Sequence, residues 1–243
     1  MEGEEQNLSA LYDRYFEAAT ANTPALLDAA YALRYRVYCV EHSFEDASTK
    51  TDGREVDACD AHSVHAVLLY RRSAEVAGCV RLILPTPELG LAALPIRALL
   101  GPEERRRMDL LPPGSTAEIS RYAVSKAFRR RAGEELYPDV DADLSAADAR
   151  RLAPHMTLGL FRGVATLATA HGVTHLCAAM APALLRLLER FGLAFARLGD
   201  PIEYHGLRQP CIAELTALRE GLSRSREEYS RFVETAFTPA AAR

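Results

Sequence analysis

Tryptophan is absent from this chain of 243 residues, and the signatures of several common protein classes are absent as well. No apolar run approaches the roughly 20 residues that cross a bilayer, so we expect no integral membrane segment. The acidic start of the chain lacks the apolar stretch of a signal peptide, and a cytoplasmic location is therefore expected. No G-x-S-x-G, Walker or G-x-G-x-x-G pattern occurs, so hydrolase and nucleotide-phosphate-binding functions lack support.

Cysteine is scarce, and the net charge is small. The five cysteines form no C-x-x-C pair, which indicates small buried thiols in a reducing compartment rather than disulfides: Cys39, Cys59, Cys79, Cys177 and Cys211. The net charge of −4 and the pI near 6.0 argue against nucleic-acid binding through bulk positive charge.

Two stretches resemble metal sites, but neither has the ligands in the arrangement that a metal ion requires. Residues 139–143 begin like a calcium loop, but Leu144 occupies the glycine position and Arg150 the position of the bidentate glutamate. His171 and His175 have the i, i+4 spacing of zinc ligands, but a helix-breaking glycine lies between them. We therefore expect neither a metal nor a redox cofactor.

The chain has the composition of one large globular domain, with 49% hydrophobic and 26% charged residues. Its patterning alternates between strands and helices, which predicts an α/β fold around one sheet. The expected strands are residues 64–71 and 75–84 (a hairpin), 116–125, 174–180 and 193–198. The expected helices are residues 8–20, 25–41, 95–100, 102–108, 150–171 and 182–191. The remaining segments are a polar loop at 43–62, an insert at 126–150, a loop at 201–210, a helical extension at 211–236 and a disordered tail at 237–243.

Six charged residues form a set, and most of them stand inside or next to apolar runs. A buried charge is tolerated only when it is paired and hydrogen-bonded, so six charges that sum to zero predict one polar network in a cleft. Two aromatic residues accompany them, Tyr38 and Phe44. The six are Arg34, Asp57, Asp60, Arg81, Glu118 and Arg121.

The spacing of these eight residues resembles the acyl-homoserine-lactone synthase family of autoinducer synthases. That family has an arginine and a phenylalanine four apart, a tryptophan, a D-x-x-D, an arginine on a strand and an E-x-x-R. The local sequence agrees at 33–38 and at 118–125, although Tyr38 and Phe44 replace the family's usual phenylalanine and tryptophan. The resemblance covers roughly residues 30–131 and implies the GNAT-type acyltransferase fold, with a largely antiparallel central sheet flanked by helices.

The C-terminal part resembles a related branch more closely. The stretch 201–210 looks like the acyltransferases associated with PEP-CTERM/exosortase systems, near the N-acyl amino acid synthases. This resemblance implies transfer of a long-chain acyl group from acyl carrier protein, or from acyl-CoA, to the amine of a small amino-acid-like acceptor. Two alternatives stay open: a lactone synthase that uses S-adenosylmethionine, and a non-catalytic module that binds acyl chains or the carrier protein.

The chemistry of acyl transfer assigns roles to these residues. Glu118 is the best carboxylate for receiving or positioning the amine, unless it only forms an ion pair with Arg34 or Arg121. Arg121 is the second catalytic candidate, and Ser120 between the two is a substrate-binding candidate. Glu118 and Arg121 would point to opposite faces of a regular strand, so a bulge is needed for both to border one cleft. The GNAT fold implies a splayed strand there that admits the pantetheine arm.

The other candidates have a structural and a functional reading each. Arg34, Asp57, Asp60 and Arg81 either brace the loop at 43–62 or contact substrate, and the aromatics Tyr38 and Phe44 either anchor that loop or line a pocket. His205 either fixes its Pro- and Gly-rich loop or transfers a proton. The run Arg129, Arg130 and Arg131 either faces solvent or meets the phosphate of a pantetheine arm or the acidic carrier protein.

Overall fold

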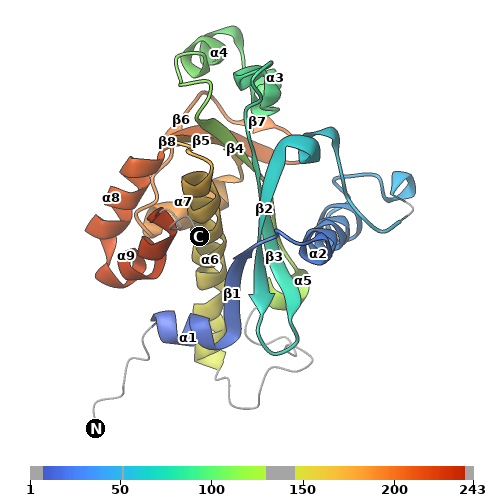
Figure 1. Ribbon diagram of the computed structural model, residues 1–243, viewed down its shortest axis with the longest axis vertical. Coiled ribbons are helices and arrows are strands. Elements are labelled where there is room, and N and C mark those ends of the chain that lie inside the picture. The colour runs from blue at the N-terminus through green and yellow to red at the C-terminus, as the bar shows by residue number, and fades with distance from the viewer. Residues whose placement is uncertain (1–7, 51, 130–145, 239–243) are drawn as a thin grey trace.

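One mixed sheet organises the chain in the computed structural model, which describes residues 8–50, 52–129 and 146–238. The strands follow the order β1-β2-β3-β4-β5-β8-β6, with β7 paired to β8 (Figure 1). Neighbouring strands are antiparallel except β4 and β5, which are parallel. The strand bounds are β1 Phe16–Thr20, β2 Ser63–Tyr70, β3 Glu75–Ile83, β4 Thr116–Val124, β5 His175–Met180, β6 Ala196–Arg197, β7 Ile202–Glu203 and β8 Leu207–Glu214. The predicted α/β class is confirmed, as is the predicted hairpin, which is β2 and β3.

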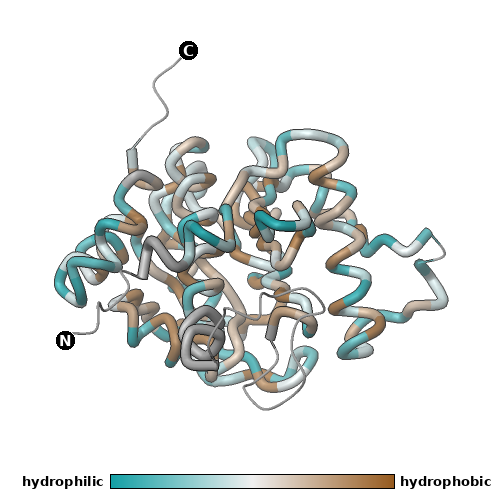
Figure 2. Tube along the Cα trace, turned by 90° about the horizontal axis from the view of Figure 1, so that it is seen from below, coloured by the Kyte–Doolittle hydropathy of each residue, from teal (hydrophilic) through white to brown (hydrophobic). Residues whose placement is uncertain are grey.

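Helices cover both faces of this sheet (Figure 1). The long helix α6 packs on β1, β2 and β3, and α2 packs on β2 and β3 from the other side. A π-helical turn at Tyr35–Glu41 continues α2, and the mostly hydrophilic loop that follows projects beyond it (Figures 1 and 2). The helix bounds are α1 Leu8–Tyr15, α2 Pro24–Arg34, α3 Ile96–Leu99, α4 Pro102–Met108, α5 Lys126–Arg129, α6 Ala146–Ala170, α7 Pro182–Arg190, α8 Leu215–Ser225 and α9 Glu227–Glu234. None of the helices within the described ranges is long and apolar enough to cross a membrane.

The predicted first helix is wrong in its second half. Residues 16–20 form β1, which pairs antiparallel with β2 from Phe16 opposite Tyr70 to Thr20 opposite Ala66. The alanine-rich sequence there suits a helix, but pairing along the edge of β2 satisfies the backbone of both segments. Tertiary pairing therefore overrides the local helix propensity.

The segment 201–214 is also corrected: it is a strand pair rather than a loop followed by helix. Its long strand β8 contains Pro210, which lies opposite Ala179 of β5. Proline lacks the N–H that a sheet ladder uses, which is why the sequence favoured a loop. The carbonyl of Pro210 accepts from the Leu198 N–H at 2.9 Å on the side of the short strand β6, so the missing N–H falls on that side and not on β5.

Two predicted irregular segments lie partly outside the described residues. Residues 130–145 of the insert 126–150 are among those not described, while α5 and the start of α6 occupy its ends. The predicted tail begins too early, because Phe237 ends a 3-10 helix and packs against the main core.

Two irregularities of β4 shape the centre of the sheet. β4 pairs with β5 only from Thr116 to Glu118, so the two parallel strands separate after that point. On its other side, the register with β3 shifts between Cys79 and Arg81, and Arg121 has a φ of 48°. The predicted bulge and the predicted splay of this strand are both confirmed.

Candidate active site

A buried arginine on α2 holds the loop that follows the π-helical turn. The Arg34 side chain is fully buried, and its Nε donates to Glu55 Oε2 at 2.6 Å. Its two terminal nitrogens donate to the two carboxylate oxygens of Asp60 at 2.7 and 3.0 Å. Two acidic loop residues that are far apart from this helix in sequence are therefore fixed to it by one guanidinium.

Two arginines on the sheet complete the network. Arg81 on β3 donates from one terminal nitrogen to Asp57 at 2.6 Å and to Asp60 at 2.9 Å, and from Nε to Ser120 Oγ at 2.9 Å. Arg121 on β4 donates to Glu55, to Asp57 at 3.0 Å and to Glu45 at 3.2 Å. The loop is thus tied to α2, β3 and β4 at once.

The D-x-x-D spacing has a local structural cause. Asp57 is the N-cap of the 3-10 helix Ala58–His62, and its Oδ1 accepts from the Cys59 N–H at 2.8 Å. Asp60 Oδ2 accepts in return from the Asp57 N–H at 2.8 Å. This reciprocal capping box holds both carboxylates in place in addition to their bonds with the arginines.

The predicted six-charge network is correct in five members and wrong in the sixth. Glu55 takes the place that was assigned to Glu118, and Glu118 has no ion pair within the part of the chain that the structure describes. The predicted alternative of a structural ion pair with Arg34 or Arg121 is therefore wrong. Glu55 was missed because it stands in a polar loop, where a charge gives no sign of burial; its place two residues before Asp57 is the only signal in the sequence.

The carboxyl groups of this network are held in their charged form. Burial alone would raise the pKa of Asp60, but hydrogen bonds with His65 and Arg34 outweigh it and leave that pKa well below its usual range. Burial would likewise raise the pKa of Glu55, but its hydrogen bonds with Arg121 and Arg34 outweigh this effect and lower the pKa. The network is therefore fully ionised at neutral pH.

Glu118 has the opposite environment. Its side chain is buried, and its carboxylate accepts a hydrogen bond from the backbone N–H of Ile96, at 2.8 Å, at the start of α3. Burial raises the pKa of Glu118 to about 7, and the Ile96 N–H and the nearby arginines offset this only in part. Glu118 is therefore a carboxyl group that exchanges its proton near neutral pH.

Glu118, Ser120 and Arg121 lie on one side of the sheet. Glu118 is paired opposite Ile83 and Ser120 opposite Arg81, so the two share the face on which α2 packs. The bulge turns Arg121 to this side too, where its guanidinium meets Glu55. The bulge therefore brings Glu118 and Arg121 to the same side of the sheet, as predicted from the sequence.

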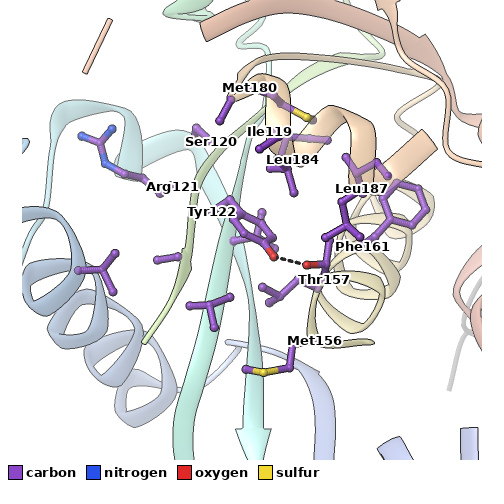
Figure 3. A pocket seen from close by; sticks show the side chains of 18 of the residues that line it. Ile119, Ser120, Arg121, Tyr122, Met156, Thr157, Phe161, Met180, Leu184 and Leu187 are labelled. Atoms are coloured by element: carbon purple, nitrogen blue, oxygen red, sulfur yellow. Dashed lines mark hydrogen bonds between the residues drawn. The ribbon is translucent and has the colours of Figure 1, made fainter. Parts of the chain in front are cut away.

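An apolar cavity of about 640 Å³ lies where β4 and β5 separate. Figure 3 shows Ile119 of β4 with side chains of α6 and α7 around it, while Arg121 points away from them. The hydroxyls of Tyr122 and Thr157 form a hydrogen bond of 2.8 Å between β4 and α6 (Figure 3). Other apolar lining residues are Val80, Val124, Phe128, Met156, Leu160, Phe161, Val164, Met180, Leu184, Leu187, Leu188 and Phe195.

Both predicted aromatics also line this cavity. The Tyr38 hydroxyl donates to the Tyr122 carbonyl at 3.0 Å, and the Arg121 guanidinium lies over the Tyr38 ring. The Phe44 ring stacks on His42 and lies 5.7 Å from the His205 ring, centroid to centroid. The aromatics thus anchor the loop and line a pocket, so the two readings are not exclusive.

Other predicted candidates fall outside this lining. His205 is exposed at the turn between β7 and β8, with a φ of 52°, and among the described residues that line the cavity its ring contacts Phe44. Arg129 ends α5, and Arg130 and Arg131 lie outside the described residues, so their predicted role is untested.

The described ranges contain no group of three or more His, Cys, Asp and Glu side chains that could hold a metal ion. The arrangement instead offers an apolar slot, a charged scaffold and one carboxyl that titrates near pH 7, which are the parts that acyl transfer to an amine requires.

Comparisons with known proteins agree with this geometry. The family model for the acetyltransferase (GNAT) domain matches residues 33–138. The structure of TofI, solved in a ternary complex with an inhibitor and MTA, is 20% identical with a TM-score of 0.57, over 86% of this chain and 96% of TofI. The AHL synthase LasI is 18% identical with a TM-score of 0.56, over 85% of this chain and 95% of LasI. FeeM, an N-acyl amino acid synthase from uncultured soil microbes, is 16% identical with a TM-score of 0.53, over 85% of this chain and 93% of FeeM.

A comparison with curated proteins gave no match. The domain match and the shared fold nevertheless agree with the eight-residue pattern of the sequence. Residues 33–138 thus match an acetyltransferase (GNAT) domain, and the chain has the fold of the autoinducer synthases and of an N-acyl amino acid synthase.

Proposed function

We propose that this protein transfers a long-chain acyl group from a thioester to the amine of an amino acid or a similar small acceptor. The observation that carries the proposal is the apolar cavity at the splay of β4 and β5. Glu118, the carboxyl group with a raised pKa, does not line this cavity but precedes the lining residue Ile119 on β4. Acyl carrier protein is the proposed donor, with acyl-CoA as the other form of the same thioester chemistry.

The splay suits a thioester donor. Beyond Glu118 the edge of β4 that faces β5 has no ladder partner among the described strands, so its backbone groups are available to the amides of a pantetheine arm. The acyl chain would then enter the cavity, whose lining is mostly apolar. Lined in this way, the slot also excludes the water that would hydrolyse the thioester.

Glu118 is the proposed proton acceptor. The acceptor's amine must lose a proton before its nitrogen can attack the thioester carbonyl carbon. A carboxylate with a pKa of about 7 takes that proton at neutral pH, while the new C–N bond forms and the C–S bond breaks to release the thiol. The thiolate of the leaving arm takes up a proton, so the reaction yields an amide and a free thiol.

The ion-pair network has a positioning role in this scheme. Arg121 is bonded to three carboxylates and Arg81 to two, so little of either guanidinium is left for substrate. They fix the bulge and the loop that carries Phe44, and thereby hold the cleft open.

The second candidate is an acyl-homoserine-lactone synthase that uses S-adenosylmethionine. The structural likeness to TofI and LasI favours it as much as the likeness to FeeM favours the first. The stretch 201–210 resembles the PEP-CTERM/exosortase-associated branch, and for that reason we place the N-acyl amino acid first. A non-catalytic module is the third candidate, and the raised pKa of Glu118, next to the cavity-lining residue Ile119, argues against it.

One assay separates the three candidates. The purified protein is incubated with acyl-loaded carrier protein or acyl-CoA, mixed amino acids and S-adenosylmethionine, and lipid extracts are read by mass spectrometry. An N-acyl amino acid is the expected product. An acyl lactone would establish the second candidate, and binding of the donor without any product would leave only the module.

The residues that line the cavity should determine which acyl-chain lengths the protein accepts. Leu184 and Leu185 are both half-buried on α7. Leu184 lines the cavity (Figure 3), whereas Leu185 is not one of the lining residues. Leu184→Trp should fill part of the cavity and lower kcat/KM for long acyl donors by about tenfold or more, with a smaller loss for short ones. Leu185→Trp, the matched control, should leave the chain-length profile unchanged, and equal effects of the two variants would place the acyl chain elsewhere.

A further inference from the structure

Arg208 brings a charge to the apolar cavity that nothing in the described structure neutralises. It stands near the start of β8, is half-buried, and lines the cavity. Its terminal nitrogen donates to the Leu207 carbonyl at 3.2 Å, and its guanidinium carbon lies 5.7 Å from the centroid of the Phe44 ring. Over residues 8–50, 52–129 and 146–238, no carboxylate forms an ion pair with it.

Arg121, the other arginine in the cavity lining, differs from Arg208 because its guanidinium is paired with carboxylates. Arg121 forms ion pairs with Glu45, Glu55 and Asp57. A guanidinium has five N–H donors, and its flat fork fits a carboxylate through two parallel hydrogen bonds. Arg208 keeps most of these donors free while its ring contact with Phe44 holds it at the cavity.

Arg208 lies on the same face of the sheet as Glu118. Side chains alternate along β8, so Arg208 shares a face with Ile212. Ile212 packs with Ile83 and Cys177, which are the strand partners opposite Glu118 on its two sides. A cation on β8 and a proton acceptor on β4 thus flank β5 on one face.

The contacts of Phe44 place this cation close to the bulge. Phe44 lies between Arg208 and Tyr38, whose hydroxyl is bonded to the Tyr122 carbonyl on β4. The phosphate of a pantetheine arm is separated from its thioester by the whole length of the arm, whereas the carboxylate of an α-amino acid is bonded directly to the carbon that bears its amine. A carboxylate is therefore the anion that fits a cation so near the reacting end.

We infer that Arg208 binds the carboxylate of the acceptor and makes the protein selective for free amino acids. The inference rests on the proposed function and narrows its acceptor to a zwitterion, with the carboxylate on Arg208 and the amine towards Glu118. The product keeps the carboxylate, so an N-acyl amino acid should occupy the same contact with its chain in the cavity.

Binding of a product and of its neutral analogue tests this without turnover. The probes are N-dodecanoylglycine and N-dodecanoylglycinamide, titrated by calorimetry at pH 7 into the full-length protein. The acid should bind the wild type about ten- to a hundredfold more tightly than the amide. Arg208→Gln should reduce this preference to about threefold or less, and Arg208→Lys, which keeps the charge, should retain part of it.

Arg186→Gln is the matched control, because Arg186 is an exposed arginine on α7 that does not line the cavity. It should keep the full preference for the acid. Equal binding of acid and amide to the wild type, or a preference that survives Arg208→Gln, would overturn the inference while the proposed function stands. A variant that loses affinity for dodecanoyl-CoA but not the acid preference would make Arg208 a phosphate contact, which also overturns it. If neither probe binds the wild type, the acyl cavity fails, and the proposed function fails with it.

Discussion

Glu55→Ala should lower the free energy of unfolding by about 3–5 kcal/mol. The side chain is 1% exposed and bonds to two guanidiniums, Arg34 from α2 and Arg121 from β4. Removing one partner of a buried ion pair leaves the other charge unpaired where water is excluded. The resulting drop in the free energy of unfolding is far larger than the net contribution of the intact pair. Urea denaturation followed by circular dichroism measures the change.

Glu45 provides the control for this prediction. It is also a glutamate bonded to Arg121, but its side chain is 29% exposed. Because solvent screens such a pair, Glu45→Ala should cost less than about 1 kcal/mol. Equal destabilisation by the two variants would show that the network is not the buried structural unit described above.

Much of the fold could be predicted from local patterns. The hairpin of β2 and β3, the long helix α6 and the alternation of β5 and α7 follow from hydrophobic periodicity bounded by glycine and proline. The errors are at β1 and β8, where pairing with a distant strand decides the conformation. Such pairing has no local signature, and in β8 the proline argues against the strand that forms.

The candidate site was predictable to a different extent. Charges inside apolar runs were found, because their burial follows from their neighbours: Arg34 and Arg81 are examples. Glu55 and Arg208 were missed as site residues, since each stands in a polar or irregular stretch and is brought to the site only by the fold. The separation of Glu118 from the arginines was also beyond the sequence, because it depends on the start of α3 lying over β4.

Glu118→Gln should change activity and stability in opposite directions. As the proposed proton acceptor, Glu118 should contribute about 10²- to 10⁴-fold to kcat, and its glutamine variant should lose this together with the rise in kcat/KM near pH 7. The Ile96 N–H can still donate to a glutamine oxygen, so the fold should persist. The measurement is the pH–rate profile of both proteins with the acceptor that the product assay identifies.

Stability gives the second half of this prediction. Between its ordinary pKa of 4.5 and its folded pKa of about 7, Glu118 binds more protons in the folded than in the unfolded chain. The stability that its neutral form contributes is therefore complete below pH 4.5 and is lost as the pH rises through 7. Glutamine does not titrate, so above pH 7 the variant should be more stable than the wild type by up to about 3 kcal/mol, and below pH 4.5 the difference should vanish.

The two halves together separate a chemical role from a structural one. Glu75→Gln, at an exposed strand glutamate paired with Arg36, is the control and should change neither the pH–rate profile nor the stability. If Glu118→Gln is stabilised at pH 8 and remains fully active, the raised pKa of the buried Glu118 carboxyl is supported, but Glu118 takes no part in the reaction. A variant that is destabilised at pH 8 would contradict the raised pKa itself. Loss of activity with a gain in stability is the expected combination. A carboxylate held in an apolar site for proton transfer lowers the free energy of unfolding, and the neutral glutamine removes that cost.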